Sequence, residues 1–155
     1  FTENYGGEVS ESKKVWQKKN TTKLDAIRDE IDALNLSEVN KCIALTSLIL
    51  ALDKVDSTLG HFTSYLKNWS ARSFNDLYLE VPKYQGNNLG HRITSIDVLS
   101  EEFASLQADL TYMDPPYGSN NEKMPPSRVR YASYYHLWTT IIANDKPSIF
   151  GSAHM

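Results

Sequence analysis

The stretch that most limits what this chain can fold into is Asp109-Leu110-Thr111-Tyr112-Met113-Asp114-Pro115-Pro116-Tyr117-Gly118. The apolar run 110–113 is typical of a buried strand, and it ends at Asp114. The two prolines that follow have no N–H for a sheet ladder and fix their own φ, so they predict a rigid turn there. This turn presents a carboxylate, a proline carbonyl and an aromatic ring past the carboxyl end of a strand, where open α/β sheets bind ligands.

A second strand is predicted just upstream, over residues 91–97, and it also ends in an acid, Asp97. Ser100 is a typical cap for a short helix that runs to about Gln107. Strand, short helix and strand form a right-handed crossover between parallel strands. Asp97 and Asp114 are therefore expected to end neighbouring strands at the same edge of a sheet.

The first half of the chain is predicted to be mainly helical. Residues 1–20 are polar, and we expect an irregular loop there with one short helix. An amphipathic helix follows, capped by Thr22 and ended by Asn35, because apolar residues recur at three- and four-residue spacing: Leu24, Ile27, Ile31 and Leu34.

Ser37 should cap a second helix over residues 39–56, which Ser57-Thr58-Leu59-Gly60 would end. This helix is apolar nearly all round from Ile43 to Leu52, so it is expected to be buried on both sides. A third short helix is predicted over residues 61–69. Its aromatic stripe indicates core packing more than base stacking.

Two further elements complete the predicted organisation. Residues 77–81 alternate with period two, which predicts a strand with one solvated face. Residues 131–142 form a helix candidate, which contains His136, interpreted as structural. We thus expect a mainly helical segment over 1–75 and part of an α/β domain over 76–155.

Composition restricts the class of protein. The chain has 155 residues, a net charge of −3 and a single cysteine, Cys42, which we expect in the core. There is no disulfide framework, no cysteine cluster for zinc, no signal peptide and no apolar stretch of about 18 residues that would span a membrane. A cytoplasmic location is the default prediction.

Local basic stretches leave nucleic-acid binding open, because phosphate contacts need only a local basic face. One stretch lies early in the chain, and the alternative interpretation there is a solvated surface. The other follows the Pro-Pro turn, where we favour a functional role. The two stretches are Lys13, Lys14, Lys18, Lys19 and Lys23, and then Lys123, Arg128 and Arg130.

The Asp-Pro-Pro-Tyr sequence at 114–117 resembles motif IV of the amino-group DNA methyltransferases. The resemblance extends to the D12 class of N6-adenine DNA methyltransferases, found in bacterial restriction–modification systems. Further similar segments occur in the family's order over about residues 20–151. They are Asn20-Thr21-Thr22-Lys23-Leu24-Asp25-Ala26-Ile27-Arg28, Leu50 to Gly60 with Tyr65-Leu66-Lys67, Asp97, and Tyr131 to Leu137.

The departures from the family pattern are also informative. The family's Phe-x-Gly-x-Gly motif is absent, Gly118 stands where asparagine is frequent, and the loop after Tyr117 is longer. The chain begins at Phe1 without an initiator methionine and stops at Met155 without an evident closing element. We therefore expect an internal fragment of a larger methyltransferase, with the missing remainder as a partner.

The resemblance implies a partial Rossmann-like class I S-adenosylmethionine-dependent methyltransferase fold, in the α/β class, with an inserted helical segment. It implies S-adenosyl-L-methionine as cofactor, double-stranded DNA as substrate and a flipped-out adenine as target. Residues 1–75 are a candidate target-recognition region. No metal is implied, because the sulfonium of the cofactor carries the chemistry.

The resemblance also implies roles for individual residues. Asp114 and the Pro115 carbonyl would accept the two N6 hydrogens, Pro116 would keep the turn rigid, and Tyr117 would stack on the base. Asp97 and Asp114 would contact the cofactor, and DNA phosphates would be bound by Lys123, Arg128 and Arg130.

Three alternatives remain open from the sequence. The first is an N4-cytosine or RNA methyltransferase, since the same geometry serves any planar amine. The second is a non-catalytic DNA-recognition fragment that keeps Asp-Pro-Pro-Tyr only as a turn. The third is an α/β interaction domain that binds a partner through the apolar helix over 43–52.

Overall fold

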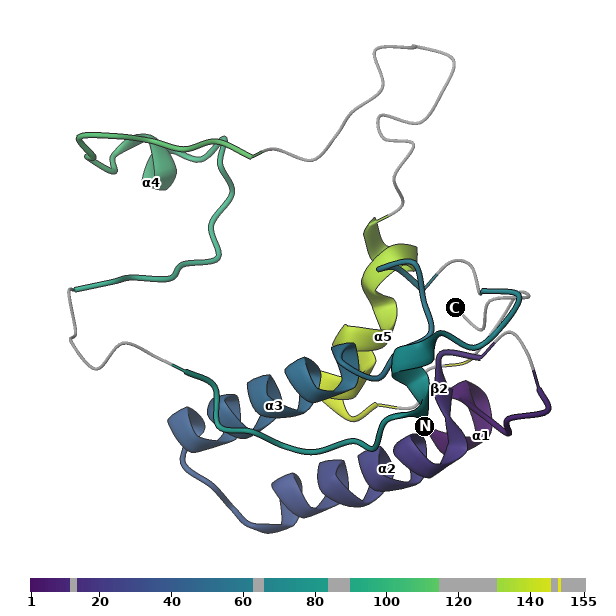
Figure 1. Cartoon of the computed structure of the whole chain (residues 1–155). Helices are drawn as coiled ribbons and strands as arrows, with labels where there is room; N and C mark the ends of the chain where they lie inside the picture. The colour runs from purple at the N-terminus through teal and green to yellow at the C-terminus, as the bar shows by residue number, and fades with distance from the viewer. Residues whose placement is uncertain (12–13, 63–65, 84–89, 115–130, 146–147, 149–155) are drawn as a thin grey trace. The chain divides into compact units, whose positions relative to one another are not determined.

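The computed structural model describes residues 1–11, 14–62, 66–83, 90–114, 131–145 and 148 (Figure 1). The chain divides into two compact units, one formed by residues 1–82 with 129–155 and the other by residues 83–128. The boundary predicted between residues 75 and 76 stays a prediction. Among the described helices, none is long and apolar enough to cross a membrane.

The first unit begins with a four-residue helix, α1 (Thr2–Tyr5), and two short parallel strands, β1 (Gly6–Gly7) and β2 (Trp16–Gln17). The short helix confirms the prediction for this region, whereas the strand pair was not predicted. Position 6 requires glycine, because a Cβ there would overlap the Thr21 hydroxyl and the Thr2 carbonyl. The strand pair thereby brings the N-terminal segment against α2.

Helix α2 (Lys18–Ala33) begins one turn earlier than predicted. The Thr22 cap was wrong: Gln17 precedes the helix, and the Thr22 hydroxyl donates to the Lys18 carbonyl inside it, at 2.9 Å. The helix ends as predicted at Asn35, which adopts a left-handed φ of 46°. Asparagine tolerates this conformation better than most residues, so it is a common residue just after a helix.

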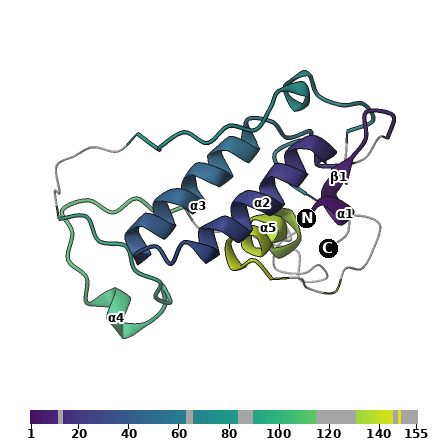
Figure 2. The same cartoon turned by 90° about the horizontal axis from the view of Figure 1, so that it is seen from below.

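Helix α3 (Glu38–Asp53) begins as predicted, with the Ser37 Oγ accepting a hydrogen bond from the Asn40 N–H at 3.3 Å. It lies beside α2 in both views (Figures 1 and 2). Burial on both sides was wrong, because Cys42 and Leu50 are exposed and only one face enters the core. The sequence showed an apolar helix all round, but among the described residues only that one face has packing partners.

The core of this unit is completed by α5 (Tyr131–Ala143), which confirms the predicted C-terminal helix. Leu137 and Ile141 of α5 are fully buried. Trp16 is also fully buried, and its Nε1 donates to the Leu52 carbonyl of α3 at 3.0 Å. In Figure 2, α5 lies beneath α2. Trp16 therefore links β2 to α3 and α5.

The strand predicted over residues 77–81 is wrong, because the described chain there is extended but pairs with no other strand. Side chains from the helices take the place of a neighbouring strand. The buried Asn20 of α2 donates to the Asn75 carbonyl and accepts from the Leu77 N–H, both at 2.9 Å. The Ser47 hydroxyl of α3 donates to the Glu80 carbonyl. Leu77 is buried, but Leu79 and Val81 are 44% and 74% exposed, so the period-two pattern predicted neither a strand nor the inward-facing residues beyond Leu77.

Replacing Asn20 by alanine is expected to release this segment. Asn20 is fully buried, and the change leaves the buried Leu77 N–H and the partly buried Asn75 carbonyl without these partners, which costs about 1–3 kcal/mol of unfolding free energy. Urea unfolding measures the loss, and amide exchange at Leu77 measures the local release. Thr22→Ala, at an exposed position of the same helix, is the matched control. An unchanged exchange rate at Leu77 in N20A would contradict the assignment.

The predicted third helix over 61–69 is also wrong for the residues that the structure describes there. A single turn of 3-10 helix, η1 (Ala71–Phe74), follows instead. This region is held by polar contacts: the Ser57 Oγ accepts from the Ser70 N–H at 2.9 Å, and the Ser70 hydroxyl donates to the Asp56 carbonyl at 2.8 Å. These contacts tie Ser70, at the start of η1, to the loop after α3.

In the second unit the regular element described is α4 (Glu101–Ala104). Its Ser100 cap is confirmed, with the Oγ accepting from the Phe103 N–H at 3.2 Å, although the helix is shorter than predicted. The strands predicted over 91–97 and 110–113 are wrong for this structure. A strand needs a neighbour for its ladder, and no described residue pairs with either segment.

Candidate functional site

Asp97 lies in the turn that leads into α4. Its Oδ1 accepts from the Leu99 N–H at 2.9 Å, and its carbonyl accepts from the Ser100 hydroxyl at 2.6 Å. An acid followed by a capping serine folds this way because short polar side chains bond to nearby backbone groups. The Asp97 side chain is exposed, and its second carboxylate oxygen accepts no hydrogen bond among the described residues. That oxygen can accept from an amine.

Asp114 also lies in the second unit, and it is exposed with no hydrogen bond or ion pair to any described residue. The residues before it are exposed too, with Leu110 and Tyr112 each 88% exposed. The sheet edge that was expected to bring Asp97 and Asp114 together is not formed among the described residues. Both acids are thus open to solvent, and their convergence stays a prediction.

The other predicted site residues lie outside the described part of the chain. These are Pro115, Pro116 and Tyr117 of the turn, and the basic residues Lys123, Arg128 and Arg130. Their roles remain predictions.

The early basic stretch is described except for Lys13, and its lysines bind groups within the chain. Lys18 pairs with Glu8 at 3.0 Å, and Lys19 pairs with Asp76 at 2.7 Å. Lys14 donates to the Asn4 carbonyl, and Lys23 to the Leu77 carbonyl with its Nζ 5.0 Å from the Tyr78 ring centre. These pairings support the interpretation as an intramolecular surface rather than a phosphate-binding patch.

His136 of α5 is half-buried between two aromatic rings, with centroid distances of 6.4 Å to Tyr5 and 6.1 Å to Phe62. This packing supports its interpretation as a structural residue. His61 stacks on Tyr134 at 4.6 Å, near the amino end of the same helix. Of the aromatic stripe predicted over 61–69, Phe62 lies in the core as predicted, whereas Tyr65 lies outside the described residues.

Sequence reasoning identified the stretch 20–28 but not the role of its polar residues. Asn20 ties residues 75–77 to α2, as described above. Asp25 ties α1 to α2, because its carboxylate accepts from the Thr2 N–H at 3.0 Å and from the Thr2 hydroxyl at 2.6 Å. Arg28 is 1% exposed and donates to the carbonyl groups of Ile141 and Ile142 in α5. The sequence showed how these residues are spaced along one helix, but it did not show which groups they bind.

A buried acid outside this stretch organises the loop after α3. Asp56 is 2% exposed, and burial raises the pKa of its carboxyl. The Thr58 hydroxyl, which donates at 2.6 Å, and the Arg72 guanidinium only partly oppose that effect. The Arg72 Nε also donates to the Asp56 carbonyl at 3.1 Å. This cluster joins the loop at 55–58 to η1.

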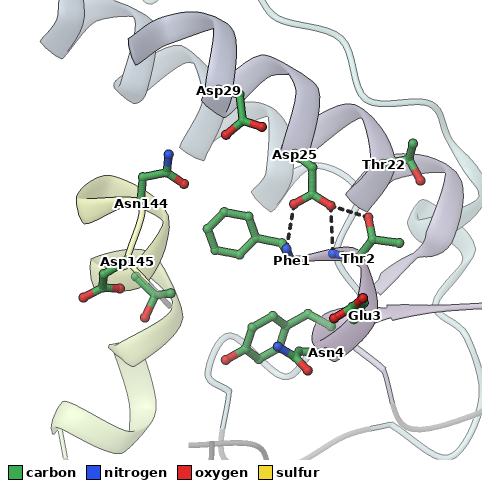
Figure 3. A pocket seen from close by; sticks show the side chains of 11 residues that line it. Phe1, Thr2, Glu3, Asn4, Thr22, Asp25, Asp29, Asn144 and Asp145 are labelled. Atoms are coloured by element: carbon green, nitrogen blue, oxygen red, sulfur yellow. Dashed lines mark hydrogen bonds and ion pairs between the residues drawn. The ribbon is translucent and has the colours of Figure 1, made fainter. Parts of the chain in front are cut away.

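A cavity of about 640 Å³ opens between α1, α2 and the end of α5 (Figure 3). The Asp25 carboxylate lines this cavity and accepts from the Thr2 N–H at 3.0 Å and from the Thr2 hydroxyl at 2.6 Å. Three more carboxylates line the cavity, those of Glu3, Asp29 and Asp145. A phosphate would be repelled by this lining, so the cavity does not fit a DNA backbone.

Comparison with known proteins identifies relatives of this chain. A family model described as "D12 class N6 adenine-specific DNA methyltransferase" matches residues 2–155. The modification methylase StsI of Streptococcus sanguinis is 33% identical over 136 residues, covering 85% of this chain and 19% of that protein. The type II methyltransferase M.NlaIII of Neisseria lactamica is 26% identical over 130 residues, covering 81% of this chain and 36% of that protein.

The chain therefore spans 19% and 36% of the lengths of these two relatives. No solved structure gave a significant match. The family model, in contrast, covers nearly every residue, including the Asp-Pro-Pro-Tyr turn at 114–117. The chain belongs to the D12 class of N6 adenine-specific DNA methyltransferases.

Proposed function

We propose that the protein transfers a methyl group from S-adenosyl-L-methionine to the N6 amino group of adenine in double-stranded DNA. The observation that carries this proposal is the family match over residues 2–155, with Asp-Pro-Pro-Tyr intact within it. One relative is named a modification methylase, which supports a role as the modification enzyme of a bacterial restriction–modification system.

The chemistry explains why these residue types are needed. The N6 nitrogen of adenine is a poor nucleophile, because its lone pair is delocalised into the ring. Two acceptors on its hydrogens, the Asp114 carboxylate and the Pro115 carbonyl, favour a more tetrahedral nitrogen whose lone pair points outward. Such catalysis works through positioning and electrostatics, and no strong base is required. Pro116 would keep both acceptors in place.

The cofactor would supply an electrophilic methyl group on a sulfonium. The residues present fit it at one point: Asp97 is exposed and has a carboxylate oxygen that accepts no hydrogen bond among the described residues, so it can accept from the adenine amino group of the cofactor. Asp114 would lie beside the methyl group. The glycine-rich motif that approaches the methionine portion would come from the remainder of the methyltransferase.

The substrate base must leave the duplex to reach these acceptors, at a cost of a few kcal/mol. Lys123, Arg128 and Arg130 follow the turn in sequence and would bind phosphates around the flipped nucleotide. Residues 1–75 would take part in target recognition. The class I fold would be completed by the remainder of the methyltransferase.

Tyr117→Ala is expected to weaken capture of the flipped base by about 1–3 kcal/mol, because a base–aromatic stack is worth that much. The affinity for cofactor should change little. A fluorescent adenine analogue at the target position reports flipping directly, and Tyr117→Phe is the matched control because it keeps the ring. Unchanged fluorescence in Y117A would contradict the stacking role.

The proposed function is tested with labelled S-adenosylmethionine and unmethylated double-stranded DNA, using the complete protein that carries this chain. We expect label to enter DNA and not RNA. Transfer to RNA alone would change the substrate class. Absence of cofactor binding and of transfer to either nucleic acid would overturn the proposal.

A further inference from the structure

Helix α3 has an apolar face that does not enter the core of the described residues. Val39 and Leu50 are 68% and 49% exposed, and Cys42 is exposed between them in the sequence. Ile43 and Ile49 are half-buried on the same side of the helix. Residues three, four and seven positions apart share one face of a helix, so these side chains form one stripe. We name it the outer stripe of α3, and its members are Val39, Cys42, Ile43, Thr46, Ile49 and Leu50.

The outer stripe contains no charged residue. Its polar member is the exposed Thr46, and the charged residues Glu38 and Asp53 lie at the two ends of α3. A helix face that stays in water normally carries charged side chains, as α2 does with the exposed Asp29 and Glu30. The residue types of the outer stripe therefore suit contact with another apolar surface better than contact with water.

The apolar surface continues onto the extended chain that follows η1. The Ser47 hydroxyl of α3 donates to the Glu80 carbonyl, and Lys54 pairs with the Glu80 carboxylate at 2.7 Å, so this segment lies along α3. Leu79 and Val81, on either side of Glu80, are 44% and 74% exposed. Apolar side chains from two segments are thus adjacent, and an exposed patch of several large apolar side chains typically marks an interaction site.

This patch does not suit DNA as its partner. Protein surfaces that bind DNA are strongly positive, because they neutralise phosphates. The outer stripe has no cation, and Lys54 at its edge is already paired with Glu80. The patch therefore fits an apolar protein surface.

The comparisons favour a protein surface from the same methyltransferase. The chain spans 19% and 36% of the two relatives, so most of the length of each relative lies outside the matched part. Permanent interfaces bury apolar side chains much as the core of a domain does. The uncharged outer stripe has the composition of such an interface.

We propose that the outer stripe of α3, together with Leu79 and Val81, is the interface at which the remainder of the methyltransferase covers this chain with an apolar surface. This inference rests on the proposal that the chain is part of a larger methyltransferase, but not on the reaction itself. It gives a role to the outer face of a helix whose sequence is apolar nearly all round.

Cys42 reports whether the outer stripe is covered. The complete protein that carries this chain is treated with N-ethylmaleimide, and alkylation of the peptide that contains Cys42 is followed by mass spectrometry. A thiol inside an interface reacts only when the interface opens, so alkylation should be at least about 100-fold slower in the native protein than in urea. Ala26→Cys, at an exposed position of α2, adds a control thiol to the same molecule and should react nearly as fast in both conditions.

Two further changes identify what covers the stripe. Leu50→Glu places an unpaired charge in the interface and should speed alkylation of Cys42 at least about 10-fold, whereas Ala26→Glu should leave its rate unchanged. Benzoylphenylalanine at Val39, which crosslinks to its neighbours in light, should join α3 to residues of the methyltransferase outside this chain. Mass spectrometry locates the crosslinked residues, and this readout does not depend on how L50E folds.

Each outcome decides the proposal. Slow alkylation with crosslinks to residues outside this chain supports it. Native Cys42 that reacts as fast as the thiol of A26C would overturn it, and so would protection that appears only when DNA is added. Crosslinks confined to this chain, or to a second copy recognised by mixing two isotopic forms, would overturn it too. A protein that passes these tests without methyl transfer would overturn the proposed function alone.

Discussion

Asp114→Ala is expected to abolish methyl transfer while leaving the fold and DNA binding close to wild type. Removing the carboxylate removes one of the two acceptors for the N6 hydrogens, and the loss of one positioned hydrogen-bond partner at a reacting group costs about 10²–10³ in kcat. Asp114 is exposed and contacts no described residue, so the unfolding free energy should change by less than about 0.5 kcal/mol. Single-turnover methyl transfer measures the chemical step directly.

Two controls sharpen this result. Asp109→Ala removes another exposed carboxylate from the same segment and should keep full activity. Asp114→Asn keeps the shape but loses the charge, so it should retain little activity. If D114A kept most of the wild-type rate, Asp114 would have no catalytic role and the turn would be structural.

Trp16→Ala has the largest expected effect on stability. The indole is fully buried, packs on Phe62 and Trp138 at 6.1 and 6.0 Å, and donates to the Leu52 carbonyl. Truncating a buried tryptophan to alanine costs about 3–5 kcal/mol, because it removes apolar contacts and leaves a cavity. Urea unfolding followed by circular dichroism measures the change.

Trp16→Phe separates the two contributions. It keeps a ring in the core but removes the indole N–H donor to the Leu52 carbonyl, which still accepts from the Val55 N–H at 3.1 Å, so the loss should be about 0.5–1.5 kcal/mol. Val9→Ala, at a residue that is 60% exposed, should be nearly neutral. A W16A variant within 1 kcal/mol of wild type would mean that the helices do not pack around this residue as described.

Helices α2, α3 and α5 could be predicted because most of their signals are local, although the helix predicted over 61–69 was wrong. The Ser37 cap, the end at Asn35 and the start of α4 at Ser100 each depend on residues within one turn of chain. The strands predicted over 77–81, 91–97 and 110–113 are not formed among the described residues. Alternation reports which residues prefer burial, whereas a strand also needs a partner far away in sequence.

Polar contacts between residues far apart in the sequence could not be predicted either. In the sequence, Arg28 is one charged residue on an amphipathic helix. In the structure it donates to the carbonyl groups of Ile141 and Ile142, more than 100 residues away. Cys42 was expected in the core because its neighbours are apolar, yet it lies on the exposed face of α3. In both cases the position of the residue depends on tertiary packing, which the local pattern does not contain.

The candidate site was predictable to the extent that its motif is contiguous. Asp114 to Tyr117 carry the catalytic assignment within four residues, and the family match supports that assignment. The cofactor and DNA contacts depend on groups brought together by a sheet, so they stay predictions until the site is probed with both ligands.

The most direct test of the central claim is to identify the methylated nucleoside. Unmethylated DNA is incubated with the complete protein and labelled S-adenosylmethionine, digested to nucleosides and separated by mass. The account predicts N6-methyladenine, which D114A does not produce. N4-methylcytosine as the labelled product, or no labelled nucleoside at all, would contradict it.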